Sequence, residues 1–580
     1  MRDRPAGTRS LLVYLHPHRS TVALLVALMV LSTALPLLTP QLLRRFVDQA
    51  AAGSPVSVLA GIALAFLVIA ITGQCVRVGA AYVANRLAWS ATNALREDLF
   101  AHVLGLDLAF HGTRTSGELI ERVDGDVTAL SSLISRFAFD MAGNALLLVG
   151  AIVLVGREDV RLGGLLALMV VAIAVVIERV QRRSAPFARA EREAEAQVTG
   201  FVEERLAGVE DLRALDASDH TLDGFLEASS MAYRANLTWE ARSGALLAGV
   251  SVLFALATWA VLAGAVLLLR TEAITVGTTI LLLQYTAIVR RPIGQLSQQV
   301  KELQRAMAGA GRVADLLAER PTLVDPPDGG VAFPATGPLE VRLDRVTFAY
   351  GADEPVLRDV SLDLAAGRSL GLVGRTGSGK TTIARLLLRL YDPTEGSVLL
   401  DGRDLREVSG DSRRSRVRLV TQDVQLFGAS LRDNLTMFSS DHDDRRLVEV
   451  MHDLGLASWL ADLPEGLDSR VGPGGAGMSA GEAQLLAFAR VHLEDPGLVV
   501  LDEASSRLDP ATESLIERAL DRLLHGRTAV LIAHRLASLD RVDDIAVVHE
   551  GRIVEHGPRA ALAADPASRF GRLLAMVASP

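Results

Sequence analysis

A glycine-rich segment at residues 374–382 has the residue types and spacing that bind phosphate groups. An apolar run at 370–373 precedes it and predicts a buried strand, and helical spacing follows it over 383–390. In this strand–loop–helix context the glycines let backbone N–H groups turn toward phosphate oxygens, and the helix N-terminus adds positive potential. We therefore expect a nucleotide phosphate site made by Gly374, Arg375, Thr376, Gly377, Ser378, Gly379, Lys380, Thr381 and Thr382.

The lysine of this segment stands out in the composition. The chain has 59 lysine and arginine residues, of which only Lys301 and Lys380 are lysine. A compact ammonium on a flexible stem fits beneath a phosphate-binding loop where a broad guanidinium does not. We expect Lys380 to reach the β- and γ-phosphates and the Thr381 hydroxyl to ligate Mg²⁺.

A pair of acidic residues ends a second predicted strand. The apolar run 498–501 leads into Asp502 and Glu503. Acidic pairs at strand ends also occur as solvated caps, but together with a phosphate-binding loop they indicate hydrolysis. Asp502 would hold the Mg²⁺ shell, and Glu503 would polarise the water that attacks the γ-phosphate. The second half of the chain is therefore predicted to be an α/β ATPase.

The first half of the chain contains six long apolar stretches, which predict six membrane-spanning helices. They are Ser20–Leu43, Val56–Val83, Phe137–Val155, Leu162–Ile177, Ala245–Leu269 and Ile274–Val289. Taken singly, the shorter fourth and sixth stretches could also be buried core helices. Short connections alternate with long, arginine-bearing ones at 84–136 and 178–244, which favours a cytoplasmic location for the long connections, for both termini and for the ATPase.

Three further features of the membrane half lead to expectations. Arg290 and Arg291, beside Pro292, either line a polar cavity or mark the cytoplasmic end of the last span. Cys75 is the only cysteine, which excludes an internal disulfide, and we expect it to be a small buried residue. Proline and glycine accumulate after the last apolar stretch, so we expect a transmembrane domain at 1–318, a linker at 319–338 and a nucleotide-binding domain at 339–580.

The net charge argues against one class of partner. The formal charge is -9 and the sequence pI is about 5.8. A nucleic-acid binder would usually show a basic face or stripe, so nucleic acid is not an expected partner.

Further motifs make the chain resemble the ATP-binding cassette (ABC) family, because they occur in the family's order. The resemblance implies that Tyr350 stacks on adenine, that Gln422 touches Mg²⁺ and couples to the membrane helices, and that His534 contacts the γ-phosphate. Residues 506–509 resemble the loop that communicates between the two sites of a dimer. In the membrane half, residues 110–126 and 201–209 resemble the two intracellular loops of six-helix exporters, which end in short coupling helices. ATP and Mg²⁺ are the implied cofactors.

The family's signature, normally Leu-Ser-Gly-Gly-Gln, is altered here to the sequence of 478–482. In the family this segment opens a helix and faces the γ-phosphate held by the partner's loop, so Ser479 and Gly481 would contact a nucleotide in trans. Ala480 adds a methyl group where the backbone should approach closely, and Glu482 adds negative charge near an anion. Tolerated drift is the alternative interpretation, but we expect functional degeneracy, and intact hydrolytic residues beside an altered signature suit a heterodimer with one degenerate site.

The resemblance thus implies an ATP-driven exporter subunit in the cytoplasmic membrane, surrounded by lipid and paired with a second half-transporter, which is expected to be a different chain. A homodimeric exporter and a membrane-embedded ATPase that gates or regulates another protein remain alternatives. The sequence does not identify the transported substrate, because aromatic content is only 4% and the spans show no acidic cluster.

Overall fold

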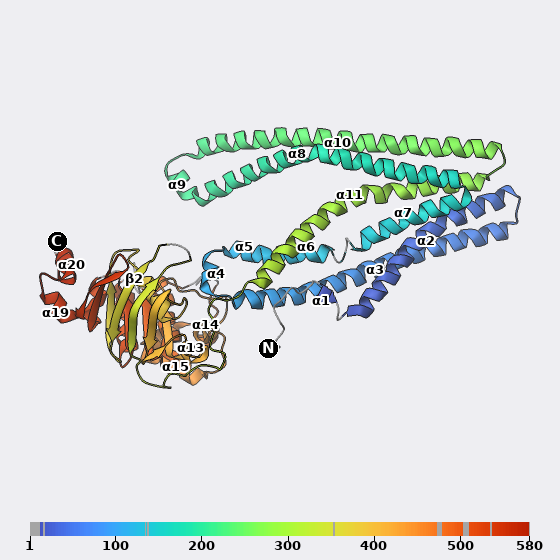
Figure 1. Cartoon of the computed structure of the whole chain (residues 1–580). Helices are drawn as coiled ribbons and strands as arrows, with labels where there is room; N and C mark the ends of the chain where they lie inside the picture. Colours follow the sequence, from blue (N-terminus) through green and yellow to red (C-terminus); the bar gives the residue numbers. More distant parts are fainter. Residues whose placement is uncertain are drawn as a thin grey trace. The chain divides into compact units, whose positions relative to one another are not determined.

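The computed structural model describes residues 12–15, 18–133, 135, 138–351, 354–472, 478–502, 510–533 and 536–578. The chain divides into two compact units (Figure 1). A helical unit comprises residues 1–105 and 115–319, and an α/β unit comprises residues 320–580 together with the short segment 106–114. The second unit therefore recruits a piece of the chain from within the helical half.

The helical unit is built on six long helices. They are α2 (Arg19–Ala51), α3 (Val56–Leu104), α7 (Ala138–Glu158), α8 (Val160–Ala207), α10 (Ser218–Arg270) and α11 (Val276–Ala318). Among the described residues, five are long and apolar enough to cross a membrane, and α11 contributes a shorter apolar stretch, Val276–Arg290. The fold class predicted from the sequence, a helical membrane domain followed by an α/β ATPase domain, is confirmed.

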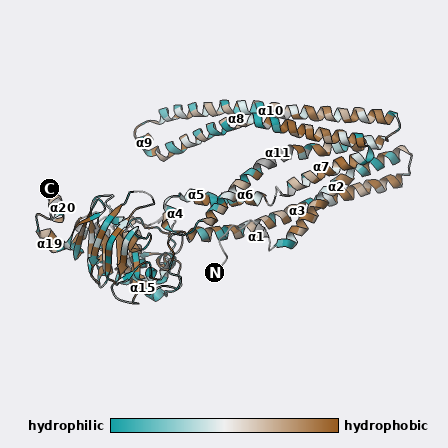
Figure 2. Ribbon diagram, viewed as in Figure 1, coloured by the Kyte–Doolittle hydropathy of each residue, from teal (hydrophilic) through white to brown (hydrophobic). Residues whose placement is uncertain are grey.

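Several of these helices are much longer than a membrane is thick. At 1.5 Å per residue, the 49 residues of α3 extend ~74 Å, whereas a bilayer core is ~30 Å thick. Figure 2 shows that hydrophobic residues concentrate in the parts of α8 and α10 remote from α9 (Val209–Ala214), while hydrophilic residues are frequent near α9. The long polar connections predicted from the sequence are thus largely helical extensions of the spans.

Shorter helices lie between α3 and α7. They are α4 (Leu108–Gly112), α5 (Ser116–Ile120), a π-helical turn at Glu121–Asp126 and α6 (Val127–Ser132), and a short α1 (Leu12–Leu15) precedes α2. The side chain of Asp126 is only 4% exposed and pairs with Arg312 of α11, whose Nε donates at 2.9 Å. This ion pair ties the first polar connection to the extension of the last span.

The helical unit shows one departure from expectation. Cys75 is exposed on α3, so the prediction of a buried cysteine was wrong. The hydroxyl of the fully buried Tyr285 donates to Leu37 O at 2.8 Å, which joins α11 to α2. Arg290 lies over the ring of Phe254 on α10, with 5.7 Å from the guanidinium carbon to the ring centroid, and the side chain of Arg291 lies outside the described part.

The α/β unit contains two sheets. An antiparallel sheet has the order β2-β1-β4-β5, and a six-stranded sheet has the order β10-β9-β3-β8-β7-β6. The strands are β1 (Val341–Phe348), β2 (Leu357–Leu364), β3 (Ser369–Val373), β4 (Glu395–Leu400), β5 (Arg403–Asp404), β6 (Val417–Val420), β7 (Leu498–Asp502), β8 (Thr528–Ile532), β9 (Asp544–His549) and β10 (Arg552–Pro558). Strands β9, β3, β8, β7 and β6 run parallel, so their carboxyl ends share one edge.

Helices cover these sheets and complete two apolar cores. They are α12 (Lys380–Leu387), α13 (Gly410–Arg416), α14 (Leu431–Thr436), α15 (Asp444–Asp453), α16 (Ala457–Asp462), α17 (Ala480–Leu493), α18 (Pro510–Leu524), α19 (Arg559–Ala564) and α20 (Arg569–Ala578). One core lies between the two sheets and α12, and the other packs α14, α15, α17 and α18 against the six-stranded sheet. Continuous burial of β3, β7 and β8 explains why their sequences are apolar throughout.

The proline- and glycine-rich segment after α11 is anchored to the α/β unit. Val331 N donates to Glu407 O at 2.9 Å, and Ser409 N donates to Val331 O at 3.0 Å. Phe333 is 6% exposed and joins the core between the sheets. These contacts hold the segment 319–338 against the α/β unit, and we call this segment the strap.

Candidate nucleotide site

Three parts of the predicted site lie at the carboxyl edge of the parallel strands. The glycine-rich loop follows β3, Asp502 ends β7, and Gln422 follows β6. Strand β8 lies between β3 and β7, and its Ile532 pairs with Leu372 on one side and Asp502 on the other. The topology thus brings to one edge groups that are up to 128 positions apart in the chain.

The glycines of the loop are required by its geometry. A Cβ at Gly374 would lie 2.3 Å from Val548 O, which no side chain can tolerate. Gly379, which begins α12, has φ +109°, and a Cβ there would lie 2.6 Å from Leu357 Cδ2. Gly374 is required because the backbone passes close to β9, and Gly379 because the backbone is left-handed and lies against a side chain of β2.

Lys380 lies inside the turn of the loop. Its Nζ donates to Gly374 O at 2.8 Å and to Arg375 O at 3.0 Å, and the residue is only 5% exposed. Nearby, the buried Ser378 Oγ has no hydrogen-bond partner among the described residues. A buried ammonium and an unsatisfied hydroxyl at a helix N-terminus fit a ligand with anionic oxygens, as a phosphate chain has.

An aromatic wall lies beside the loop. The Tyr350 ring meets Phe348 and Tyr391 edge-on, with centroids 4.8 and 5.2 Å apart. The Tyr350 hydroxyl is 3.1 Å from Thr382 Oγ1 and accepts from Arg385 at 3.1 Å. The buried Thr382 therefore supports this wall directly.

Tyr391 is a member of the wall that the sequence analysis missed. It lies in the segment after α12, eleven positions beyond Lys380, and burial raises the pKa of its hydroxyl. An aromatic shortly after the helix that follows a phosphate-binding loop is the only sequence signal that could have indicated it.

The segment that contains Gln422 is tied to α17. Gln422 is exposed, and Arg490 of α17 donates to Gln425 O at 3.1 Å and to Asn434 O at 2.6 Å. Burial lowers the pKa of Arg490, and the carbonyl oxygens replace the water that its guanidinium loses. Arg490 thereby connects the predicted Mg²⁺-contacting segment to the helix that the signature opens.

The signature begins α17 with a capping box. Ser479 Oγ accepts from Glu482 N at 3.2 Å, and Glu482 Oε2 accepts from Ser479 N at 2.7 Å. Glu482 Oε1 also accepts from the indole of Trp459 at 2.7 Å. Partial burial raises the pKa of Glu482, but the bonds from Ser479 and Trp459 outweigh it and hold that pKa below its usual range.

This geometry modifies the electrostatic argument made from the sequence. The Glu482 charge is directed at the N-terminus of its own helix and at Trp459. Ser479 and Ala480 are exposed at the start of α17, whereas Gly481 is buried. The alteration that reaches the surface is therefore the methyl group of Ala480.

Several predicted residues lie outside the described part of the chain. They are Glu503, His534 and the segment 506–509.

A chain of contacts links α4 to the end of the phosphate-loop helix within the α/β unit. Asp107 caps α4 by accepting from Phe110 N, and it also accepts from the Thr322 hydroxyl at 2.7 Å. Burial raises the pKa of Asp107, but its bonds from Thr322 and Phe110 prevail and lower it overall. Beyond Thr322, the strap contacts Arg389.

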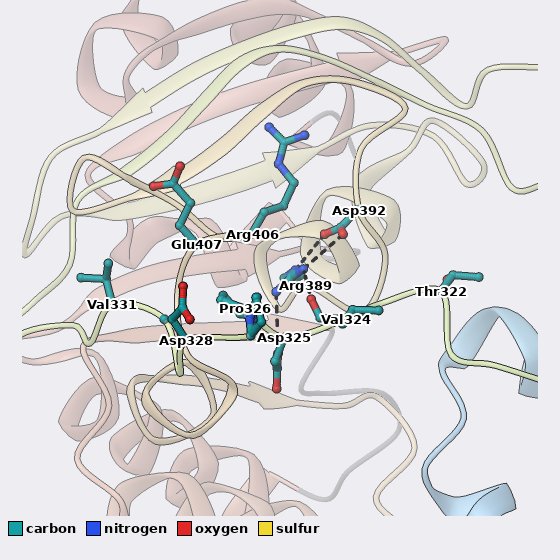
Figure 3. A pocket seen from close by; sticks show the side chains of 12 residues that line it. Thr322, Val324, Asp325, Pro326, Asp328, Val331, Arg389, Asp392, Arg406 and Glu407 are labelled. Carbon is teal, nitrogen blue, oxygen red and sulfur yellow. Dashed lines mark hydrogen bonds and ion pairs between the residues drawn. The ribbon is translucent and has the colours of Figure 1, made fainter. Parts of the chain in front are cut away.

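Arg389 anchors that strap just beyond α12. Its guanidinium, 5% exposed, donates to Asp392 at 2.9 Å and to Val324 O at 3.1 Å, and it lies near Asp325. Figure 3 shows Arg389 and these partners in the wall of an open cavity of about 700 Å³. One buried cation thus fixes the strap to the end of α12.

Comparison with known proteins decides the family. Residues 22–293 match the family model described as the ABC transporter transmembrane region, and residues 357–506 match the model described as ABC transporter. The chain belongs to the ABC transporter family. An ABC transporter ATP-binding protein of Bacillus subtilis, YknV, is 31% identical over 559 residues, which cover 94% of this chain and 91% of that protein.

Two further matches show the type of transporter. A multidrug efflux ATP-binding/permease protein of Mycobacterium tuberculosis is 32% identical over 565 residues, and the chain spans about half of that protein, 47%. The structure of a bacterial Atm1-family ABC exporter with ATP bound superposes with a TM-score of 0.79 at 26% identity, covering 97% of this chain and 99% of the other.

This chain is therefore an ABC exporter half-transporter, with its membrane region and ATPase domain fused. It is a multi-pass membrane protein whose nucleotide-binding domain is cytoplasmic and binds ATP, and hydrolysis in its ABC domain is coupled to export.

Proposed function

We propose that this exporter subunit works as one half of a heterodimer with unequal ATP sites. One site combines this chain's phosphate loop with the partner's signature and hydrolyses ATP. The other combines the partner's loop with the altered signature at 478–482 and mainly holds nucleotide. The observation that carries the proposal is a complete phosphate loop in the same chain as an exposed Ala480 at the first position of α17.

The proposal assigns a role to each residue predicted from the sequence. Lys380 and the loop amides of 374–382 bind the phosphates, and Tyr350 stacks on adenine. Glu503 positions the attacking water, and His534 contacts the γ-phosphate. We keep 1–318, 319–338 and 339–580 as the proposed membrane domain, linker and nucleotide-binding domain.

Mg²⁺ is the metal that fits the donors proposed for it. Thr381, Gln422 and Asp502 offer hydroxyl, amide and carboxylate oxygens, which Mg²⁺ prefers, and phosphate oxygens would complete the shell. The described residues contain no cluster of three His, Cys, Asp or Glu side chains that would hold a metal by themselves. The ion is thus expected to bind together with ATP, where it neutralises phosphate charge.

The physical basis of the unequal sites is steric. At a signature the helix N-terminus and its backbone amides must approach a γ-phosphate closely, which a glycine at position 480 would permit. The Ala480 methyl group holds the backbone away from the anion. The Ser479 side chain bonds both to Glu482 N and to the Glu482 carboxylate, so its hydroxyl is held in the capping box.

The tip of the α8–α10 hairpin supports the presence of a partner subunit. An apolar groove of about 330 Å³ lies there, lined by Phe201, Val209, Leu222 and neighbouring residues. Leu206 is 65% exposed and Leu215 is 78% exposed. Exposed apolar groups of this kind indicate a surface that another protein covers. We assign this surface to docking on the partner's nucleotide-binding domain.

Several relatives carry names that state an apolar or amphipathic cargo. One is called a lipid A-core flippase of Chromobacterium violaceum, and another a fatty acid transporter of Mycobacterium bovis. We therefore propose export of an amphipathic compound. A gate or regulator of another protein would not move a compound across the membrane itself. ATP-dependent uptake of the compound into sealed inside-out vesicles therefore separates the two functions.

Copurification tests the heterodimer. The tagged chain, expressed from its native locus and purified in mild detergent, should retain one other half-transporter whose signature is closer to Leu-Ser-Gly-Gly-Gln. An active homodimer, or a partner with an equally altered signature, would contradict the proposal.

A further inference from the structure

We infer that the cavity between α2, α3, α7 and α11 binds the acidic headgroup of an amphipathic ligand, and that Arg77 is its anion-binding group. The inference rests on the proposed export function and specifies the chemistry of the cargo. The cavity has a volume of about 550 Å³, and every wall belongs to the helical unit. Its lining includes Arg77, Asp140, Asn144, Leu147, Ile288 and Gln295.

The depth of the cavity follows from the helix lengths. Each helix is measured from its outer end, where short connections join α2 to α3, α7 to α8 and α10 to α11. Arg77 lies 21 residues from the start of α3 and Gln295 lies 19 residues from the start of α11, or ~32 and ~29 Å along the helices. Asp140 lies 18 residues before the end of α7, or ~27 Å. The polar end of the cavity is therefore near the cytoplasmic boundary of a ~30 Å bilayer core.

The apolar end of the same cavity lies deeper in the membrane. Leu147 is 11 residues before the end of α7, and Ile288 is 12 residues after the start of α11, which places both ~17–18 Å from the outer ends. Polarity therefore falls along the cavity from the cytoplasmic boundary toward the bilayer centre. A molecule with a polar head and an apolar tail matches this gradient.

The distribution of charge selects an acidic head. Arg77 is exposed at this boundary and has no hydrogen bond or ion pair among the described residues, so its guanidinium can meet a ligand in the cavity. Asp140 has an interaction of its own, and Asn144 donates to Gln295 at 3.1 Å. Arg77 thus supplies the cation, and a carboxylate or phosphate is the group that pairs with a guanidinium in two parallel hydrogen bonds.

The chain contains a matched control for Arg77. Arg86 is exposed on the same helix, nine residues further on. At about 100° per residue, nine residues turn ~180°, so Arg86 lies on the opposite face of α3 and outside the cavity lining. Arg77→Gln and Arg86→Gln each remove one positive charge. Arg77→Lys keeps the charge but removes the guanidinium, which can make two parallel hydrogen bonds.

The test uses three photoactivatable dodecyl probes that differ only in the head: a carboxylate, an alcohol and a trimethylammonium. Each is added to the purified complex in nanodiscs of neutral phosphatidylcholine, and labelled peptides are identified by mass spectrometry. We expect the carboxylate to label peptides of α2, α7 and α11 roughly tenfold more than the other probes. Arg77→Gln should abolish this preference, Arg77→Lys should retain part of it, and Arg86→Gln should leave it unchanged.

The source of the acidic amphipath is distinguished in the same assay. If phosphatidylglycerol in the nanodisc reduces labelling by the carboxylate probe, the natural ligand is a membrane lipid. If it does not reduce labelling, the ligand is a free amphipath. Equal labelling by all three heads, or equal effects of the Arg77 and Arg86 changes, would overturn the inference. ATP hydrolysis is measured on the same samples, so a complex that hydrolyses ATP but shows no head preference refutes the ligand class alone, whereas an inactive wild-type complex refutes the proposed function.

Discussion

The indole nitrogen of Trp459 donates a 2.7 Å hydrogen bond to Glu482, the residue that stands where the family's signature has glutamine. Together with the bond from Ser479 N, it directs the Glu482 carboxylate back onto the helix that the signature opens. The carboxylate expected to oppose a nucleotide is thus committed to local structure, and Ala480 is the altered residue that is exposed. This relationship leads to distinct predictions for the two positions.

Glu482→Gln should change stability in a pH-dependent way. Because hydrogen bonds hold the pKa of Glu482 below the ordinary value of 4.5, its stabilising contribution is complete above that value and is lost as the pH falls through the lower folded pKa. At pH 7 we expect the apparent Tm of the nucleotide-binding domain to fall by roughly 2–4 °C. The difference from wild type should shrink toward pH 4 in differential scanning fluorimetry.

Glu340→Gln is the control for that measurement, because the exposed Glu340 carboxylate makes no hydrogen bond or ion pair among the described residues. It should leave the Tm unchanged at both pH values. A wild-type Tm that responds to pH no differently from Glu482→Gln would show that the capping box does not contribute.

Restoring the signature should do little for total turnover. We expect the partner also to lack a good base at the position equivalent to Glu503, so Ala480→Gly with Glu482→Gln should change ATPase activity by less than about twofold. Altering the partner's signature should instead remove most of the activity. A large gain on restoration would mean that this chain's signature alone limits the slow site.

Tyr350→Ala should weaken ATP binding by roughly 1–3 kcal/mol, the range for base–aromatic stacking. Tyr350→Phe keeps the ring against Phe348 and Tyr391 and loses only the contacts of the hydroxyl with Thr382 and Arg385. ATP affinity of the phenylalanine variant should stay close to wild type in equilibrium binding. Equal losses in both variants would assign the effect to the hydroxyl contacts.

The contact between Asp107 and Thr322 should couple ATP hydrolysis to transport. Asp107→Ala removes the cap of α4 and the acceptor for Thr322, so hydrogen exchange over 106–114 should accelerate and cargo moved per ATP hydrolysed should fall. Adding Thr322→Val to Asp107→Ala should lower the cargo moved per ATP by less than the sum of the effects of the two single changes. Strict additivity would show that the two side chains act separately.

The sequence predicted the parts of the site in which chemistry depends on short spacing. The glycines and Lys380 lie within nine positions, and strand–loop–helix order fixes their geometry. Tyr391 and Arg490 were missed, because Arg490 reaches Gln425 across 65 positions and only the packing of α17 brings them together. The capping box of Ser479 and Glu482 could have been recognised, since Ser-x-x-Glu before an apolar run is its usual pattern.

In the membrane half, too, local sequence predicted some features and missed those that depend on packing. Apolar length predicted where the spans lie, whereas their cytoplasmic extensions and the exposure of Cys75 depend on which helix faces meet. The strap at 319–338 was predicted to be a linker from its prolines and glycines. Its attachment through Arg389 and Val331 depends on partners more than 60 positions away, which local sequence does not reveal.

The most direct test of the central claim, that the phosphate loop of this chain forms the hydrolytic site of the exporter, is ATP turnover by the purified complex carrying Glu503→Gln. Removing the carboxylate that positions the attacking water should lower turnover by two or more orders of magnitude while ATP remains bound, because positioned bases contribute about 10²–10⁴ in rate. Retained nucleotide with lost hydrolysis is the predicted result. Near-normal hydrolysis by the variant complex would contradict the account.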